Sequence, residues 1–183
     1  CVFVIASDSR SNYLHTDKSL AATLNMRYLS ASEHPGWLIK ENTVLGVAKN
    51  LGYQYVHLSS GWSITKRSKH ADTELVRDKP IQLLLNDFFL GLLRNTMAVP
   101  LARAIGTDIA TLFATNLGER FNNNMLALRE IPDISGPTFT FSHNLPPHPP
   151  FIFDRNGNLP QKPKMEFQGD VWKDADRYID QLR

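Results

Sequence analysis

The pattern of apolar and polar residues predicts three strands in this chain. The opening run CVFVIAS, residues 1–7, is apolar and β-branched and has the length of a buried strand. Residues 53–60, YQYVHLSS, alternate in a strand-like way, and Val56 and Leu58 are the side chains expected inside. Residues 138–142, TFTFS, alternate in the same manner. We therefore expect at least three strands, widely separated in the sequence.

A helical period follows the first predicted strand. Leu20, Leu24 and Tyr28 lie four residues apart, so they fall on one face of a helix. The segment SEHPGW then breaks this pattern with Pro35 and Gly36, two residues that commonly interrupt helices. The sequence therefore predicts a helix that does not continue through this segment.

Four further segments have helical patterns. The first runs from about Asn42 to Leu51 and stops at Gly52, a residue that often ends helices. The second, Pro80 to Leu93, is strongly apolar, and a looser one extends from Thr107 to about Leu128. The last begins near the end of the chain, at WKDADRYIDQLR. The apolar face of the first of these helices consists of Val44, Leu45, Val47 and Ala48.

Helices that alternate with apolar strands indicate an α/β domain with a mostly parallel sheet. With 183 residues the chain is long enough for one such domain, residues 1–183. The net charge of +2, without a basic patch interleaved with aromatic residues, argues against a nucleic-acid partner. Cys1 is the single cysteine, which excludes an internal disulfide and a cysteine zinc cluster.

The segment between the first strand and the first helix is one candidate site. A helix start offers free N–H groups and the positive end of the helix dipole, which favour an anion. Thr16 is the best placed hydroxyl there, with Ser11 and Ser19 behind it. A threonine at this point can lose its proton to a metal and attack phosphorus or sulfur. The alternative is that Thr16, or Asp17, simply caps the helix.

The end of the third predicted strand is a second candidate site. His143 and His148 follow it, at the place where the loops of α/β sheets bind ligands. Imidazoles there can hydrogen-bond an anionic oxygen, protonate a leaving group or bind a metal. The alternative is a polyproline-like surface loop with two solvated histidines. Four prolines restrict the backbone around them: Pro146, Pro147, Pro149 and Pro150. A weaker signal is the Ser59–Gly61 segment after the second strand, a candidate rim of the same site.

Four segments together resemble a known family. SNYLHTDKSLAATLNMRYL, GYQYVHLSSGW, FTFSHNLPPHPPFIFDRNGN and WKDADRYIDQL occur in an order that is similar to membrane-anchored sulfatase-like proteins. These proteins belong to the alkaline phosphatase superfamily, beside the sulfatases and the lipoteichoic acid synthase type of phosphotransferase. The segment H…PHPPF is similar to the PHxPF loop of sulfatases and is the most specific of the four.

The resemblance implies a doubly wound, alkaline-phosphatase-like α/β fold and a metal-dependent hydrolase or phosphotransferase site. By motif position Thr16 is the nucleophile and a metal ligand. His148 and His143 contact the phosphate or sulfate oxygens, and Asn12 belongs to the same substrate-binding set. One or two divalent cations (Mn, Zn, Mg or Ca) are implied. The substrate is a small-molecule, lipid or glycan phosphate or sulfate ester.

The sequence also differs from the family. The CxPSR-like motif that carries the sulfatase nucleophile is not present, so a threonine in its place favours phosphoryl or phosphodiester chemistry over sulfate esters. The acidic metal ligands of the family lie before and after the matched region. We therefore expect a central piece of a larger catalytic domain, inactive alone, with most metal ligands outside this chain. In its parent protein this piece would lie on the extracytoplasmic side of a membrane. It would be attached to that membrane only through flanking segments.

Two other interpretations remain open. The chain can be a non-catalytic sulfatase-fold domain that binds an anionic glycan or a lipid head group through the histidines and the helix dipole. It can also be an α/β domain in which neither candidate site is used.

Overall fold

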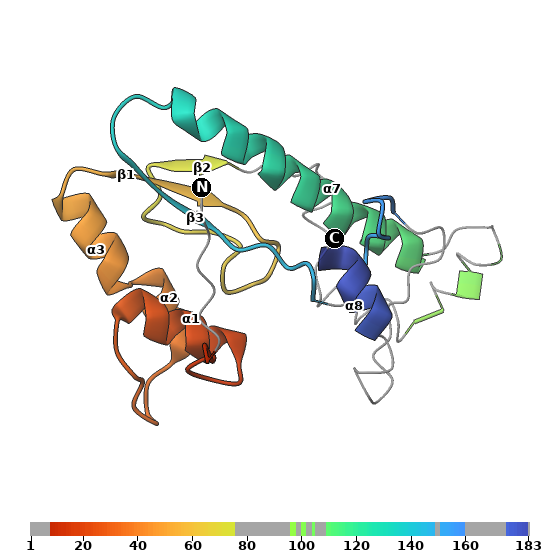
Figure 1. The fold of residues 1–183 in the computed structure, drawn as a ribbon, viewed down its shortest axis with the longest axis horizontal. Helices are drawn as coiled ribbons and strands as arrows, with labels where there is room; N and C mark the ends of the chain where they lie inside the picture. Colours follow the sequence, from red (N-terminus) through yellow and green to blue (C-terminus); the bar gives the residue numbers. More distant parts are fainter. Residues whose placement is uncertain are drawn as a thin grey trace.

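The computed structural model describes residues 8–75, 96–97, 100–101, 104, 109–148, 151–159 and 175–182. The described part is a mixed α/β arrangement built on a small parallel sheet (Figure 1). The strand expected at residues 1–7 and the helix expected from Pro80 to Leu93 lie outside the described residues.

Within the described residues the sheet has three strands in the order β2-β1-β3, and both pairings are parallel. The central strand β1 is Gln54–Leu58, and β3 is Thr138–Ser142. Both were predicted from the sequence, and so was a parallel sheet. The edge strand β2, Thr73–Leu75, was not predicted, because three residues are too few to show a periodic pattern.

One face of the sheet is covered by α7, the helix Ile109–Glu130, as Figure 1 shows. Successive residues of a strand point to opposite faces, so Val56 and Leu58 share this side. Both are fully buried and pack with Ala127 of α7. The predicted helix from Thr107 to Leu128 is thus confirmed within two residues at each end. The 3-10 turn η1, Ile131–Asp133, then leads back toward β3.

The opposite face carries an aromatic ladder. Tyr55 lies beside Phe139 and His57 beside Phe141, in agreement with the strand register. The ring centroids are 5.7 Å apart in the first pair and 5.9 Å apart in the second. Such cross-strand contacts between directly opposed residues stabilise a sheet. Three short helices lie on this side: α1 (Thr16–Asn25), α2 (Pro35–Lys40) and α3 (Thr43–Asn50). The described chain therefore has helices on both faces of the sheet (Figure 1).

Helix α1, Thr16–Asn25, has the predicted start but not the predicted cap. The N-cap residue is His15, and no side chain caps the helix, so Thr16 and Asp17 are both already helical. The helix ends at Met26, whose φ of 54° is left-handed. Tyr28, expected on the apolar face, therefore lies beyond the helix and is 75% exposed.

Helix α2, Pro35–Lys40, begins at the proline that was expected to interrupt the helical pattern. Proline is well tolerated in the first turn of a helix, because the N–H that it lacks would have no helical partner there. The predicted break is confirmed, because α1 ends at Asn25, but the start of a new helix at Pro35 was not predicted.

Helix α3, Thr43–Asn50, is confirmed close to its predicted bounds. Asn42 caps it, since its side-chain oxygen accepts from the Leu45 N–H at 2.8 Å. Of the expected apolar face, Leu45 is buried but Val47 is 48% exposed.

Helix α8, Ala175–Leu182, confirms the helix expected at the end of the sequence. Gln181 joins it to the segment after β3. Its side-chain oxygen accepts from the Ile152 N–H at 2.8 Å, and its amide nitrogen donates to the Pro147 carbonyl at 3.2 Å. The loop that follows β3 is therefore held from outside by α8.

Candidate functional site

The loops after β1 and β3 meet at one edge of the sheet. Leu58 and Ser142, the last residues of the two strands, are register partners, so the residues that follow them are neighbours. Ser59 and Ser60 leave β1, and Asn144 lies two residues beyond β3. The carboxyl edge of a parallel sheet is the usual ligand position in open α/β folds.

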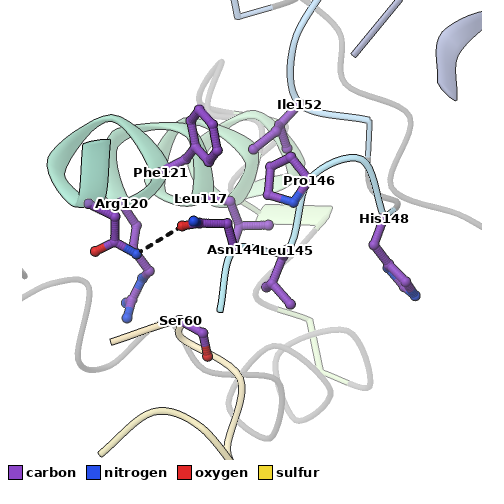
Figure 2. A pocket seen from close by; sticks show the side chains of 10 residues that line it. Ser60, Leu117, Arg120, Phe121, Asn144, Leu145, Pro146, His148 and Ile152 are labelled. Atoms are coloured by element: carbon purple, nitrogen blue, oxygen red, sulfur yellow. Dashed lines mark hydrogen bonds between the residues drawn. The ribbon is translucent and has the colours of Figure 1, made fainter. Parts of the chain in front are cut away.

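Helix α7 ties these two loops together through Asn124. Its side-chain nitrogen donates to the Ser59 carbonyl at 3.0 Å. The same nitrogen donates to the Asn144 side-chain oxygen at 3.2 Å, the dashed line in Figure 2. Asn144 in turn donates to the Ser142 hydroxyl at 3.2 Å. Asn124 is 6% exposed, so its polar groups are satisfied mainly by these contacts. The network holds both loops in a defined position.

Arg120 lies one helical turn before Asn124 and brings a positive charge to the same place. It is 6% exposed, and its Nη1 donates to the Ser59 hydroxyl at 3.3 Å. Gly61 makes room for it: a Cβ on this glycine would lie 2.9 Å from Arg120 Nε and 3.0 Å from Cζ. A buried guanidinium is a strong donor set for planar or tetrahedral oxyanions.

These groups line an open pocket of about 370 Å³, a volume that includes its mouth. Figure 2 shows Asn144 pointing toward α7 and His148 further out along the loop. The apolar wall consists of Leu117, Phe121, Leu145, Pro146 and Ile152. The polar lining consists of Ser60, Arg120, Asn124, Asn144 and His148. Hydrogen-bond donors and one fixed cation on an apolar wall fit an anionic group attached to an apolar one.

His143 lies beside this pocket and does not line it. Its Nδ1 is 2.9 Å from the Thr65 hydroxyl, and its ring meets Trp62 edge-on at a centroid distance of 5.4 Å. Burial lowers the pKa of His143, and the positive charge of His148 lowers this pKa further. The two predicted histidines are thus brought close enough to influence each other.

A chain of hydroxyls connects His143 to the pocket. The Thr65 hydroxyl is also 2.7 Å from the Ser60 hydroxyl, and Ser60 accepts from the Trp62 N–H at 2.9 Å. Ser60 is 4% exposed and Thr65 is 2% exposed, so bulk water does not compete for these bonds. Ser60 is the member of the chain that lines the pocket.

Thr16 and Asn12 form a separate group at the start of α1. Thr16 is exposed. Asn12 accepts from the Ser19 hydroxyl at 2.7 Å, and Ser11 lies 3.2 Å from the same hydroxyl. Within the described ranges no hydrogen bond joins this group to His143 or to the pocket lining.

The described part of the pocket does not by itself suit a divalent cation. Hard cations prefer carboxylate and carbonyl oxygens, whereas the polar lining offers hydroxyl, amide, imidazole and guanidinium groups. Across the residues that the structure describes, no three or more His, Cys, Asp or Glu side chains gather in a way that could hold a metal ion. The described lining therefore favours an anion over a metal. A separate search of the same residues finds no helix with the length and apolar character needed to cross a bilayer.

Sequence reasoning missed the polar stripe of α7. Asn116, Arg120 and Asn124 are four residues apart, so they share one helix face, and all three are buried. Polar residues at a helical spacing inside an otherwise amphipathic segment are unusual at buried positions. The segment NLGERFNNN contains this spacing, but Glu119, Asn122 and Asn123 are polar too, so the sequence alone does not single out Arg120.

No family model matches the chain, and neither the curated proteins nor the solved structures give a significant match. What the site can bind therefore follows from its own geometry and chemistry.

Proposed function

We propose that this chain is the central part of a metal-dependent sulfatase-like hydrolase or phosphotransferase that acts on phosphate or sulfate esters. The observation that carries the proposal is the pocket at the carboxyl edge of a parallel sheet. There Arg120, Asn124 and Asn144 surround a space that His148 borders. In this arrangement the Arg120 guanidinium offers charge-assisted hydrogen bonds to a tetrahedral oxyanion, which is the group that both ester classes share.

In this proposal the fold is an incomplete, doubly wound domain of the alkaline-phosphatase type. The support is the sequence resemblance together with an all-parallel sheet that has helices on both faces. The parent protein would be anchored to a membrane with this domain on the extracytoplasmic side.

The proposed roles follow the resemblance residue by residue. Thr16 is the candidate nucleophile, exposed at the first residue of α1. His148 contacts the anion directly, whereas His143 reaches the pocket through the Thr65 hydroxyl. The divalent cation (Mn, Zn, Mg or Ca) would be held mainly by ligands outside this chain.

A second function has its own support. A domain that only binds an anionic glycan or a lipid head group needs donors and an apolar wall, and the described pocket has both. It does not need Thr16 near the anion. The position of Thr16 relative to a bound anion therefore separates the two functions.

Sulfate binding, followed by amide chemical shifts in the 183-residue chain, tests both functions. We expect the amides of Ser60, Asn144 and His148 to shift, and we expect Arg120→Gln to weaken the affinity by about tenfold or more. Arg120→Lys should lose less, because it keeps the charge. Arg129→Gln, an exposed arginine on the same helix, is the matched control and should change nothing.

Each outcome has a defined meaning. A shift of Thr16 together with the pocket residues supports the enzyme, and a pocket response without Thr16 supports the binding domain. If sulfate changes the amide shift of no pocket residue, or if Arg120→Gln binds sulfate as tightly as the unchanged chain, the proposed anion site is wrong. Both proposed functions are then rejected.

A further inference from the structure

The hydroxyl chain beside the pocket has a direction that depends on one proton. A hydroxyl has one proton to donate, so each link between Ser60, Thr65 and His143 can be donated from only one side at a time. The Trp62 N–H is a fixed donor to Ser60 at 2.9 Å, because a backbone amide cannot reverse. Only the two hydroxyl links, of 2.7 Å and 2.9 Å, can change direction.

With a neutral imidazole whose Nδ1 carries no proton, the chain runs away from the pocket. Thr65 then donates to His143 Nδ1, and Ser60 donates to Thr65. The Ser60 oxygen faces the pocket only as an acceptor, which disfavours a bound oxyanion. Burial of His143 lowers its pKa and so favours this neutral state in the empty pocket.

With a proton on Nδ1 the chain runs toward the pocket. His143 donates to Thr65, Thr65 donates to Ser60, and the Ser60 proton is released to point elsewhere. Inside the protein its alternative acceptor is the Trp62 carbonyl, at a long 3.5 Å. An anionic oxygen in the pocket is a better acceptor, since a hydrogen bond to a charged group is about twice as strong.

We propose that Ser60 is the hydroxyl that donates to a bound oxyanion, and that His143, acting through Thr65, is the positioning residue that turns this hydroxyl toward the pocket. The inference rests on the proposed function, because it requires an anion in the pocket. Anion binding is thereby coupled to the uptake of one proton at His143, from which the bound anion is separated by two hydroxyls.

Other charged groups surround the chain of hydroxyls and also influence proton uptake at His143. Arg120 of α7 and His148 of the loop after β3 line the pocket, and Arg67 follows Thr65 by two residues. His57 of β1 has a backbone hydrogen bond with Thr65, and burial lowers its pKa also. The test must therefore separate the hydroxyl chain from simple attraction between imidazolium and anion.

Sulfate is the suitable probe, because its charge does not change between about pH 5 and pH 8. We expect the sulfate affinity of the unchanged chain to rise as the pH falls, by at most about tenfold per pH unit for one coupled proton. Thr65→Ser keeps the hydroxyl and should keep this slope. Thr65→Val and Ser60→Ala should both reduce the dependence of the sulfate affinity on pH. His148→Gln should lower the affinity itself, and adding Thr65→Val to His148→Gln should still reduce the pH dependence.

The double variant Ser60→Ala/Thr65→Val decides whether the residues act in series. Members of one chain are not additive, so the double variant should lose no more than the worse single variant. A ring ¹⁵N spectrum of the empty protein should show the neutral His143 with Nδ1 unprotonated, whether or not sulfate binds.

Three results would overturn the inference. Full additivity, or an unchanged slope in Thr65→Val, removes the hydroxyl chain but leaves the anion site and the proposed function intact. A neutral His143 that is protonated on Nδ1 contradicts only the proposed direction of the hydrogen bonds between the hydroxyls. If sulfate binds at no pH in this range, the proposed function falls, and the inference falls with it.

Discussion

At the scale of single residues, Gly61 is the position where backbone and site depend on each other most directly. Its φ of 80° is left-handed, and its missing Cβ leaves the space that Arg120 Nε occupies. Gly61→Ala therefore adds two costs, the strain of a left-handed alanine and the displacement of a buried guanidinium. Gly52 has a similar φ of 83°, but a Cβ added there would meet none of the described residues within 4 Å, so among these residues Gly52→Ala adds only the first cost.

We expect Gly52→Ala to lower the free energy of unfolding by about 1 kcal/mol and Gly61→Ala to lower it by about 2 kcal/mol or more. Urea unfolding of the two variants measures this difference. Gly61→Ala should also weaken sulfate binding, while Gly52→Ala should not. Equal losses in both variants would show that the Arg120 contact contributes nothing.

At the scale of elements, one buried asparagine holds the three short helices together. The Asn25 nitrogen donates to the Ala21 carbonyl in α1 at 2.8 Å and to the Leu38 carbonyl in α2 at 3.0 Å. Its oxygen accepts from the Thr43 amide and hydroxyl at the start of α3, both at 3.1 Å. These helices are short, and helices of this length depend on tertiary contacts for their stability.

Asn25→Ala should lower the free energy of unfolding by about 2–3 kcal/mol, because it leaves buried carbonyl and amide groups without their partner. Thr23→Ala, an exposed position on the same helix, is the control and should change it by less than about 0.5 kcal/mol. Thermal or urea unfolding measures both values. A loss of the same small size in both variants would mean that water replaces Asn25 without cost.

At the scale of the whole molecule, the buried imidazole of His57 and the half-buried imidazole of His143 make the stability depend on pH. Burial lowers the pKa of both His57 and His143 below the value in the unfolded chain, about 6.5, and Glu74 only partly offsets this effect for His57. The unfolded chain therefore binds more protons below this pH than the folded chain does. Stability is complete above about pH 7.5 and is lost as the pH falls through about 6.5.

Each of these histidines can contribute at most about 1.4 kcal/mol per pH unit to that loss. We expect His143→Gln to flatten the dependence between about pH 7.5 and pH 5 without removing it, because His57 remains. Urea unfolding at several pH values measures the slope. A slope that is unchanged in His143→Gln would show that His143 titrates alike in the folded and unfolded chains.

Local patterns were enough to predict β1, β3, α7 and α8, because each has a period or a bounded apolar run within its own residues. Local patterns were not enough to predict β2, because this strand is held by its contacts with β1. The carboxylate of Asp72, the residue before β2, accepts from the Tyr55 N–H of β1 at 2.7 Å. Nor did they decide between a break and a helix start at Pro35, since a proline permits both.

The sequence by itself therefore determined the α/β class, the parallel strands and the position of two histidines directly after β3. Only the tertiary structure decided which residues meet at the sheet edge. Arg120 and Asn124 come from the middle of a long helix, and Ser60 follows a strand that lies far from them in the chain. A site assembled across such distances depends on strand register and helix packing, and a local pattern contains neither.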